Sequence, residues 1–82
     1  MNQDQIRIGL RVRSLCEFSG VPKGTEAVID ELYDGGFMVA WDLPDRPLPP
    51  GYHQYDGRPT IKSRILGDGF DQERELQYLE IV

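Results

Sequence analysis

The chain has very few of the residues from which reactive and metal-binding sites are built. Its 82 residues include one cysteine, Cys16, and one histidine, His53. A single cysteine excludes an internal disulfide and any zinc site made from several thiolates. A lone histidine needs carboxylate partners to hold a metal, and the spacing of Asp45 and Asp56 from His53 does not argue for such a site. We therefore expect no metal site and no cofactor.

Long apolar runs are also missing. No stretch approaches the roughly 18 apolar residues that a membrane-spanning helix requires. The N-terminus lacks the charged start and apolar core that are typical of a secretory signal. These absences predict a soluble, cytoplasmic protein that does not associate with membranes.

Basic residues are scarce relative to acidic ones. Lys and Arg number 9 against 14 Asp and Glu, which gives a net charge of −5. This balance disfavours nucleic-acid binding, which depends on neutralising phosphates with Lys and Arg. The simplest interpretation of the charges is a solvated surface with ordinary ion pairs, and the alternative is a basic arm that docks on an acidic surface, such as that of a second copy. The basic residues of that arm gather between positions 46 and 64: Arg46, Arg58, Lys62 and Arg64.

Residues 24–42 have the pattern of a β-hairpin. Two runs rich in β-branched and aromatic residues flank Asp34-Gly35-Gly36, whose glycines tolerate the positive φ angles of a tight turn. Alternation places Phe37, Val39 and Trp41 on one face of the second run. An isolated hairpin is marginal in water, so we expect further strands to close over this face and bury Trp41.

The N-terminal part predicts one strand and one loop. Residues 1–5 are polar, and we expect them to be frayed. Residues 6–15 alternate apolar side chains with arginines, as a half-buried antiparallel strand does, and Gly9 within them indicates a bulge or a close backbone approach. Residues 16–24 are punctuated by glycine and proline, which predicts a loop. We expect Phe18 and Val21 of this loop to lie over one open end of the core.

The C-terminal part predicts two more strands. Residues 60–66 alternate in the same way and read as a strand that ends in a turn at 67–69. Residues 70–76 read as one helical turn, with Asp71 as its N-cap. The chain then closes with a short strand over 78–82.

The segment from Leu43 to Pro59 is rich in proline and glycine, which excludes a regular strand or helix. Loops beyond about 12–15 residues are uncommon in compact domains and are usually functional or mobile. Aromatic side chains beside prolines give a rigid contact surface at low entropy cost. We therefore interpret this proline-rich segment as a binding loop; the alternative is that it folds over its own barrel and covers a sheet edge. The predicted contact residues are Arg46, Tyr52, His53, Tyr55 and Arg58.

Three stretches resemble the SH3-like barrel superfamily. Residues 9–15 are similar to the opening strand of such barrels, and residues 24–30 with Val39-Ala40-Trp41 are similar to their Gly-Thr-Val hairpin. Residues 75–82 resemble the closing turn and strand. Photosystem I subunit IV, the variable chain of ferredoxin–thioredoxin reductase and type II dihydrofolate reductase share this pattern. The resemblance implies a single all-β domain over residues 1–82, a small five-stranded barrel with one helical turn before the last strand.

The resemblance also bears on function. The photosynthetic relatives act as docking subunits without catalysis of their own, whereas the reductase builds its site from a Val-Gln-Ile-Tyr run that residues 61–65 lack. Glu26 also departs from the pattern, because some relatives have valine there. We therefore expect a non-catalytic interaction or docking module that self-associates through its proline-rich loop. The alternative is a small oligomeric enzyme or ligand-binding protein with a pocket formed between subunits, because a chain this short lacks room for a deep private pocket.

Overall fold

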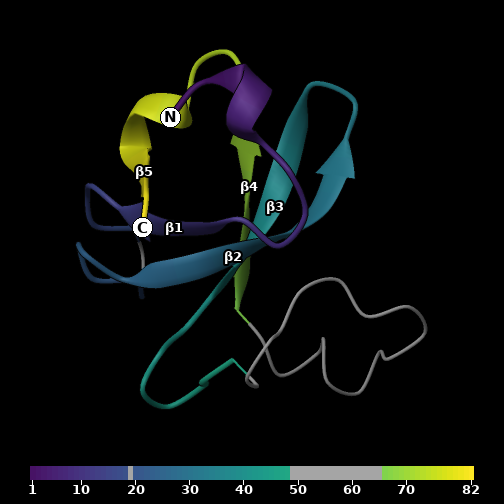
Figure 1. Cartoon of the computed structure of the whole chain (residues 1–82). Helices are drawn as coiled ribbons and strands as arrows, with labels where there is room; N and C mark the ends of the chain where they lie inside the picture. Colours follow the sequence, from purple (N-terminus) through teal and green to yellow (C-terminus); the bar gives the residue numbers. More distant parts are fainter. Residues whose placement is uncertain (19, 49–65) are drawn as a thin grey trace.

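The computed structural model describes residues 1–18, 20–48 and 66–82. These residues form a five-stranded antiparallel sheet, in the order β4-β3-β2-β1-β5, that curls into a half-barrel (Figure 1). The all-β prediction is confirmed, and the curled sheet is consistent with an SH3-like fold in general. The strands are β1 (Arg11–Ser14), β2 (Glu26–Tyr33), β3 (Gly36–Trp41), β4 (Gly67–Asp71) and β5 (Leu79–Ile81).

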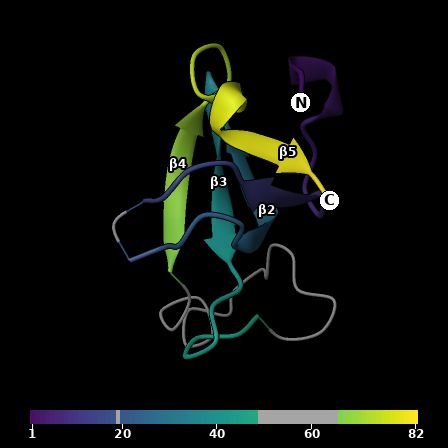
Figure 2. The same ribbon diagram turned by 90° about the vertical axis from the view of Figure 1, so that its left-hand side faces the viewer.

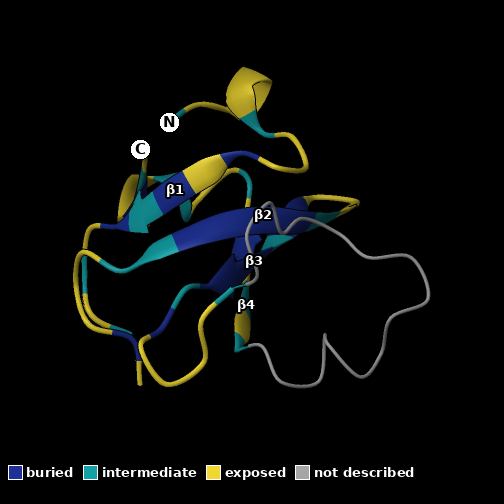
Figure 3. Ribbon diagram, turned by 60° about the horizontal axis from the view of Figure 1, so that its bottom comes forward, coloured by how far each residue is buried: buried dark blue, intermediate teal, exposed yellow. Residues whose placement is uncertain are grey.

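The predicted hairpin is formed by β2 and β3. Its register pairs Ala27 with Trp41 at the open end and Tyr33 with Gly36 at the turn. Gly35 adopts φ +85°, the left-handed conformation that the turn requires. Trp41 is fully buried, as its position in the alternation predicts. Figure 3 shows β3 largely in the colour of buried residues. The hairpin is therefore the centre of the sheet, with a neighbour on each side.

The core draws apolar side chains from every strand. Phe70 of β4 lies at its middle, with its ring 5.8 Å from that of Phe37 and 6.2 Å from that of Trp41. Burying side chains of this kind contributes roughly 1.5–3 kcal/mol each. The fully or nearly fully buried residues from the strands are Val12, Ala27, Ile29, Phe37, Val39, Trp41, Phe70 and Leu79.

The first strand is shorter than predicted. The strand covers Arg11–Ser14 rather than the whole of 6–15, and its ladder with β2 pairs residues 11–13. Gly9 turns the chain with φ +93°, while its N–H still donates to the Ile29 carbonyl at 2.8 Å. The chain thus stays against β2 but loses its regular alternation, and Ile8 is left exposed.

The N-terminus is also more ordered than predicted. Residues Gln3–Gln5 form a 3₁₀-helix, η1, whose first turn is closed by a capping box. The Asn2 side chain accepts from the Asp4 N–H at 3.1 Å, and the Gln5 side chain accepts from the Asn2 N–H at 2.9 Å. These reciprocal bonds satisfy backbone donors that a frayed end would leave to water.

The predicted turn at 67–69 is wrong, because these residues lie inside β4. Gly67 and Gly69 pair with Ala40 and Met38 of β3. A Gly-Asp-Gly sequence has the local preference of a turn, yet hydrogen bonding to a distant strand overrides that preference. The strand predicted at 60–66 falls outside the described residues except for Leu66, whose carbonyl accepts from the Trp41 N–H at 2.9 Å.

The predicted helical turn starts later than expected. It is the 3₁₀-helix η2 (Leu76–Tyr78), and β5 follows it directly. Asp71 nevertheless caps the preceding turn, because its Oδ1 accepts from the N–H groups of Glu73 and Arg74 at 2.7 and 3.0 Å. These two hydrogen bonds hold the pKa of Asp71 below its usual value.

Candidate functional site

The predicted contact residues fall mostly outside the part of the chain that the structure describes. Arg46 is the exception, and its side chain is exposed to solvent. The other predicted contacts lie outside the described residues: Tyr52, His53, Tyr55 and Arg58.

Arg46 lies on a tight turn that begins the proline-rich segment. The Arg46 N–H donates to the Leu43 carbonyl at 3.1 Å, and the Leu43 N–H donates to the Arg46 carbonyl at 3.4 Å. Asp42, directly after β3, accepts the Leu48 N–H on its Oδ1 at 2.9 Å. Leu43 is buried against the core, whereas Pro44 is exposed. The segment therefore leaves the sheet through an anchored turn, which we call the 43–46 turn.

A second candidate surface lies on the loop between β1 and β2. An open hollow of about 460 Å³ is lined by Glu17, Phe18, Gly20, Val21 and Pro22. Phe18 and Val21 exchange backbone hydrogen bonds of 2.9 and 2.8 Å, which close the tip of the loop into a tight turn. The Val21 side chain is buried and joins the core. The prediction that Phe18 and Val21 lie over the core is therefore confirmed.

Phe18 connects this hollow to the aromatic core. Its ring centroid lies 5.7 Å from that of Trp41, 5.5 Å from that of Phe70 and 6.4 Å from that of Tyr78. The contacts with Phe70 and Tyr78 are edge-to-face, a favoured arrangement of aromatic rings. The loop is thereby fastened to β3, β4 and η2, and its hollow has a rigid apolar floor.

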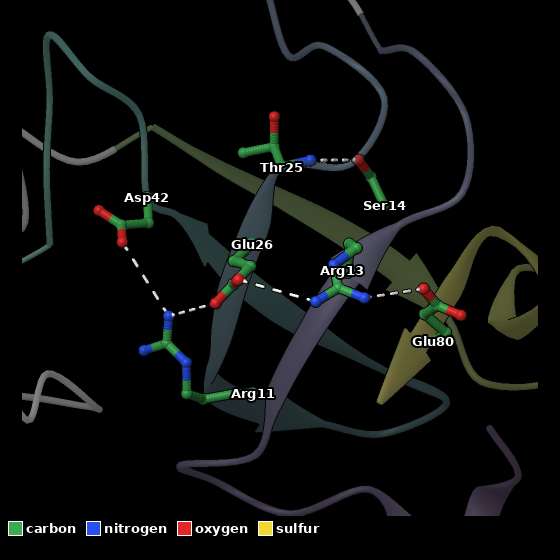
Figure 4. A network of polar contacts seen from close by, with 7 residues as sticks. All are labelled: Arg11, Arg13, Ser14, Thr25, Glu26, Asp42 and Glu80. Atoms are coloured by element: carbon green, nitrogen blue, oxygen red, sulfur yellow. Dashed lines mark hydrogen bonds and ion pairs between the residues drawn. The ribbon is translucent and has the colours of Figure 1, made fainter. Parts of the chain in front are cut away.

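The base of the same loop is fixed by hydroxyl groups. Ser14 at the end of β1 is buried, and its Oγ accepts from the Thr25 N–H at 3.1 Å (Figure 4). The same Oγ donates to the Pro22 carbonyl at 3.2 Å. The Thr25 hydroxyl donates to the same carbonyl at 2.6 Å. Because each group on this buried serine is satisfied, the loop leaves and rejoins the sheet in one defined geometry. Sequence reasoning identified neither residue.

The arginines of β1 are paired with carboxylates. Arg11 lies 2.9 Å from Glu26 and 4.0 Å from Asp42, and Arg13 lies 3.8 Å from Glu26 and 3.2 Å from Glu80 (Figure 4). Arg13 is directly opposite Glu26 of β2 and Glu80 of β5 in the register. We call this row the charge ladder. Carboxylates of the same chain neutralise the charge of these arginines. The ladder is therefore a set of ion pairs that stabilises the sheet rather than a basic patch for a partner.

The ladder also changes the acidity of its central residue. The hydrogen bond from Arg11 holds the pKa of Glu26 below its usual value, and the positive charges of Arg11 and Arg13 act in the same direction. Partial desolvation of the carboxylate opposes both effects. Glu26 is therefore ionised wherever the folded protein is near neutral pH.

A further polar contact reaches from the core to β4. The Trp41 indole Nε1–H donates to Asp68 Oδ2 at 2.6 Å. Asp68 is placed for this contact because it pairs with Val39, so its side chain lies on the core face of the sheet at the strand edge. No sequence pattern indicates this partnership, because residues 67–69 predict a turn.

The described residues show no arrangement for metal binding. Within residues 1–18, 20–48 and 66–82, no three histidine, cysteine or carboxylate side chains gather closely enough to hold an ion. In the same ranges, no helix has the length and apolar character needed to cross a bilayer.

Fold and surface together define a small all-β half-barrel with an anchored proline-rich turn and an aromatic-floored loop. Comparison with known protein families, with curated proteins and with solved structures gives no significant match. The function must therefore be argued from this chain's own residues.

Proposed function

We propose that this chain is a non-catalytic docking module of the SH3-like barrel superfamily, which binds another protein through its proline-rich segment, residues 43–59. The observation that carries the proposal is the 43–46 turn. It is held by backbone bonds and by Asp42, yet it presents Pro44, Asp45 and Arg46 to solvent. A loop that starts from a fixed point loses less conformational entropy on binding than a free one.

The composition of the segment supports the same function. Proline restricts φ, and Tyr and Arg are the residue types most enriched at the energetic centres of protein interfaces. Arg46, Tyr52, His53, Tyr55 and Arg58 are the contact residues of this proposal.

A second copy of the chain is the partner we propose. Residues 66–82 carry a strong acidic excess, with Arg74 as their one basic residue. A basic arm on one copy and an acidic surface on another are complementary, which favours association and sets its orientation. The acidic residues that we propose to meet this arm are Asp71, Glu73, Glu75 and Glu80.

The proposal predicts a change in molar mass when the loop contacts are removed. The variant Tyr52→Ala/Tyr55→Ala, and separately Arg46→Ala, should shift the protein from oligomer to monomer in light scattering coupled to size-exclusion chromatography. Losing a central aromatic or arginine contact weakens an interface by about 1–4 kcal/mol, so the dissociation constant should rise at least about fivefold.

Arg7→Ala is the matched control, because it removes an exposed arginine from the irregular segment before β1. It should leave the molar mass of the wild-type protein unchanged. The self-association proposal is wrong if the wild-type protein is monomeric at high concentration, or if the loop variants keep the wild-type mass.

A ligand-binding protein is the second candidate, and the hollow on the β1–β2 loop favours it. This hollow is open at the surface, so a second subunit would have to close it around a ligand, as a pocket formed between subunits requires. This candidate requires a metabolite that raises the melting temperature of the protein, whereas the docking module requires none.

A further inference from the structure

The outer edge of β4 has backbone groups that point away from the sheet. The Trp41 N–H donates to the Leu66 carbonyl, and the Gln72 N–H donates to the Gly35 carbonyl. The pairs Trp41–Leu66 and Gly35–Gln72, at the two ends of the β3–β4 ladder, are therefore hydrogen-bonded pairs. Hydrogen-bonded and non-hydrogen-bonded pairs alternate along an antiparallel ladder. Asp68 and Phe70 therefore also bond to β3, while Gly67, Gly69 and Asp71 direct their N–H and C=O groups outward.

One end of this edge is already closed. The Asp71 N–H donates to Glu75 Oε1 at 2.8 Å, and the Asp71 carbonyl accepts the Glu75 N–H at 3.1 Å. Nothing in the described part of the chain pairs with the outward groups of Gly67 and Gly69, and both residues are exposed. Figure 2 shows β4 as the outermost strand of the sheet. Among residues 1–18, 20–48 and 66–82, the edge is thus unpaired over Gly67–Gly69 and ends at Asp71.

The two faces beside this edge differ in chemistry. On the core face, Asp68 uses Oδ2 to accept from Trp41, and its Oδ1 has no partner among the described residues. On the opposite face the glycines carry no side chain. A Cβ on Gly69 would lie 2.9 Å from the Tyr33 hydroxyl and 3.2 Å from the Met38 sulfur, so these two side chains cover the glycine.

These observations indicate which kind of segment can bind at this edge. We propose that β4 binds an extended segment of a partner protein by strand addition, and that this segment alternates basic and apolar side chains. Its apolar residues pair with Gly67 and Gly69 and lie over Tyr33 and Met38, while a Lys or Arg between them lies opposite Asp68. Main-chain hydrogen bonds supply affinity in this mode, and alternate side chains supply specificity.

The negative charge of Asp68 favours a basic partner segment over the β4 strand of a second copy. Antiparallel pairing of two β4 strands that matches Gly67 with Gly69 in both directions places Asp68 directly opposite its own copy. Like charges that face each other across strands are destabilising. A basic residue at that position instead gives Asp68 a counter-ion at Oδ1, the oxygen that has no partner among the described residues.

The test uses a blocked hexapeptide of alternating Lys and Val, titrated into the full chain at low salt. Binding should slow hydrogen exchange at the Gly67 and Gly69 amides at least tenfold, as observed by NMR. Asp68→Asn keeps an acceptor for Trp41 but removes the charge, so it should weaken binding at least threefold while far-UV circular dichroism stays unchanged.

Two modified peptides provide matched controls. Methylating the backbone nitrogens of the valines removes the donors that would face Gly67 and Gly69, and this peptide should not bind. Methylating those of the lysines removes donors that point away from β4, and this peptide should still bind. Alternation along a strand makes these two sets of donors distinct.

The inference is overturned if the Lys-Val peptide does not bind, if both methylated peptides bind alike, or if Asp68→Asn has no effect. It is also overturned if the chain without peptide dimerises and protects the Gly67 and Gly69 amides. The inference goes beyond the proposed function: Tyr52→Ala/Tyr55→Ala should bind the peptide as the wild type does, so the failure of one proposal is distinguishable from the failure of the other.

Discussion

Trp41 shows how one residue joins the core to the edge of the sheet. Its side chain is fully buried, and a buried indole N–H needs an acceptor. Asp68, 27 positions later in the chain, provides it at 2.6 Å. The contact ties β3 to the outer strand β4 by a side-chain hydrogen bond in addition to the ladder.

Replacing this indole should therefore destabilise the fold. Trp41→Phe removes the donor, leaves Asp68 Oδ2 without its partner and shortens the ring, so the free energy of unfolding should fall by about 1–3 kcal/mol. Urea unfolding followed by far-UV circular dichroism measures this. Asp68→Asn retains a carbonyl acceptor and should lose less, and equal losses in the two variants would contradict the role of the hydrogen bond.

Glycine is needed at position 36 for a reason other than the turn conformation that its sequence context indicates. In the Asp34-Gly35-Gly36 turn, Gly35 alone adopts positive φ. A Cβ on Gly36 would instead lie 2.5 Å from the Phe70 carbonyl and 2.8 Å from the Tyr33 ring. The second glycine is thus needed because β4 and Tyr33 approach closely, which no local turn pattern encodes.

At the scale of the element, β1 is stabilised on one face by the charge ladder. Glu26 lies between Arg11 and Arg13, and its lowered pKa means that folding favours its ionised form. A group of this kind contributes stability above its unfolded pKa, and the contribution is lost as pH falls through the lower folded value. The ladder should therefore matter near neutral pH and vanish in acid.

Glu26→Gln tests this dependence. The variant should be less stable than the wild type at about pH 7, and the two should converge as the pH falls below the ordinary Glu value of about 4.3. Urea unfolding across this range measures the difference, and high salt should reduce it because the ladder is half-exposed. Glu17→Gln removes an exposed carboxylate outside the ladder and is the control. A difference that persists unchanged at low pH would contradict the pairing.

The element β4 illustrates competition between local and tertiary preference. Glycine and aspartate favour turns, which is why residues 67–69 predict one. The ladder with β3 from Gly36 to Ala40 nevertheless holds them extended. A strand so poor in side chains is tolerated at the sheet edge because Tyr33 and Met38 cover its glycines. Because the glycines have no side chains, the outward backbone groups of β4, which have no partner among the described residues, can be reached by a partner strand.

At the scale of the whole molecule, Phe18 links the loop between β1 and β2 to three separate elements. Its ring contacts those of Trp41, Phe70 and Tyr78. The half-barrel therefore has a loop that is part of its core rather than an appendage. The hollow on that loop keeps its shape only if this aromatic hub is intact.

Phe18→Ala should consequently destabilise the whole fold, although Phe18 is only partly buried. Removing about half of a buried phenylalanine's contribution lowers the free energy of unfolding by roughly 1.5–3 kcal/mol. Leu15→Ala, at a residue 41% exposed, should change it by less than about 0.5 kcal/mol. Urea unfolding measures both. Similar values for the two variants would show that the loop packs independently of the core.

Sequence alternation predicted the hairpin and the burial of Trp41, and the glycines and prolines of residues 16–24 predicted the loop that places Phe18 and Val21 over the core, because these patterns act over a few neighbouring residues. It missed Ser14, Thr25 and Asp68, whose roles depend on partners across strands. It also extended the first strand through Gly9, where the backbone turns.

The sequence by itself determined the all-strand class and the turn at Gly35, since alternation and glycine act over a few neighbouring residues. Only the tertiary structure decided that Gly67 and Gly69 form an edge, that Asp68 holds the indole and that the arginines of β1 are paired. Those outcomes depend on which distant strands lie side by side, and the curling of the sheet sets that arrangement.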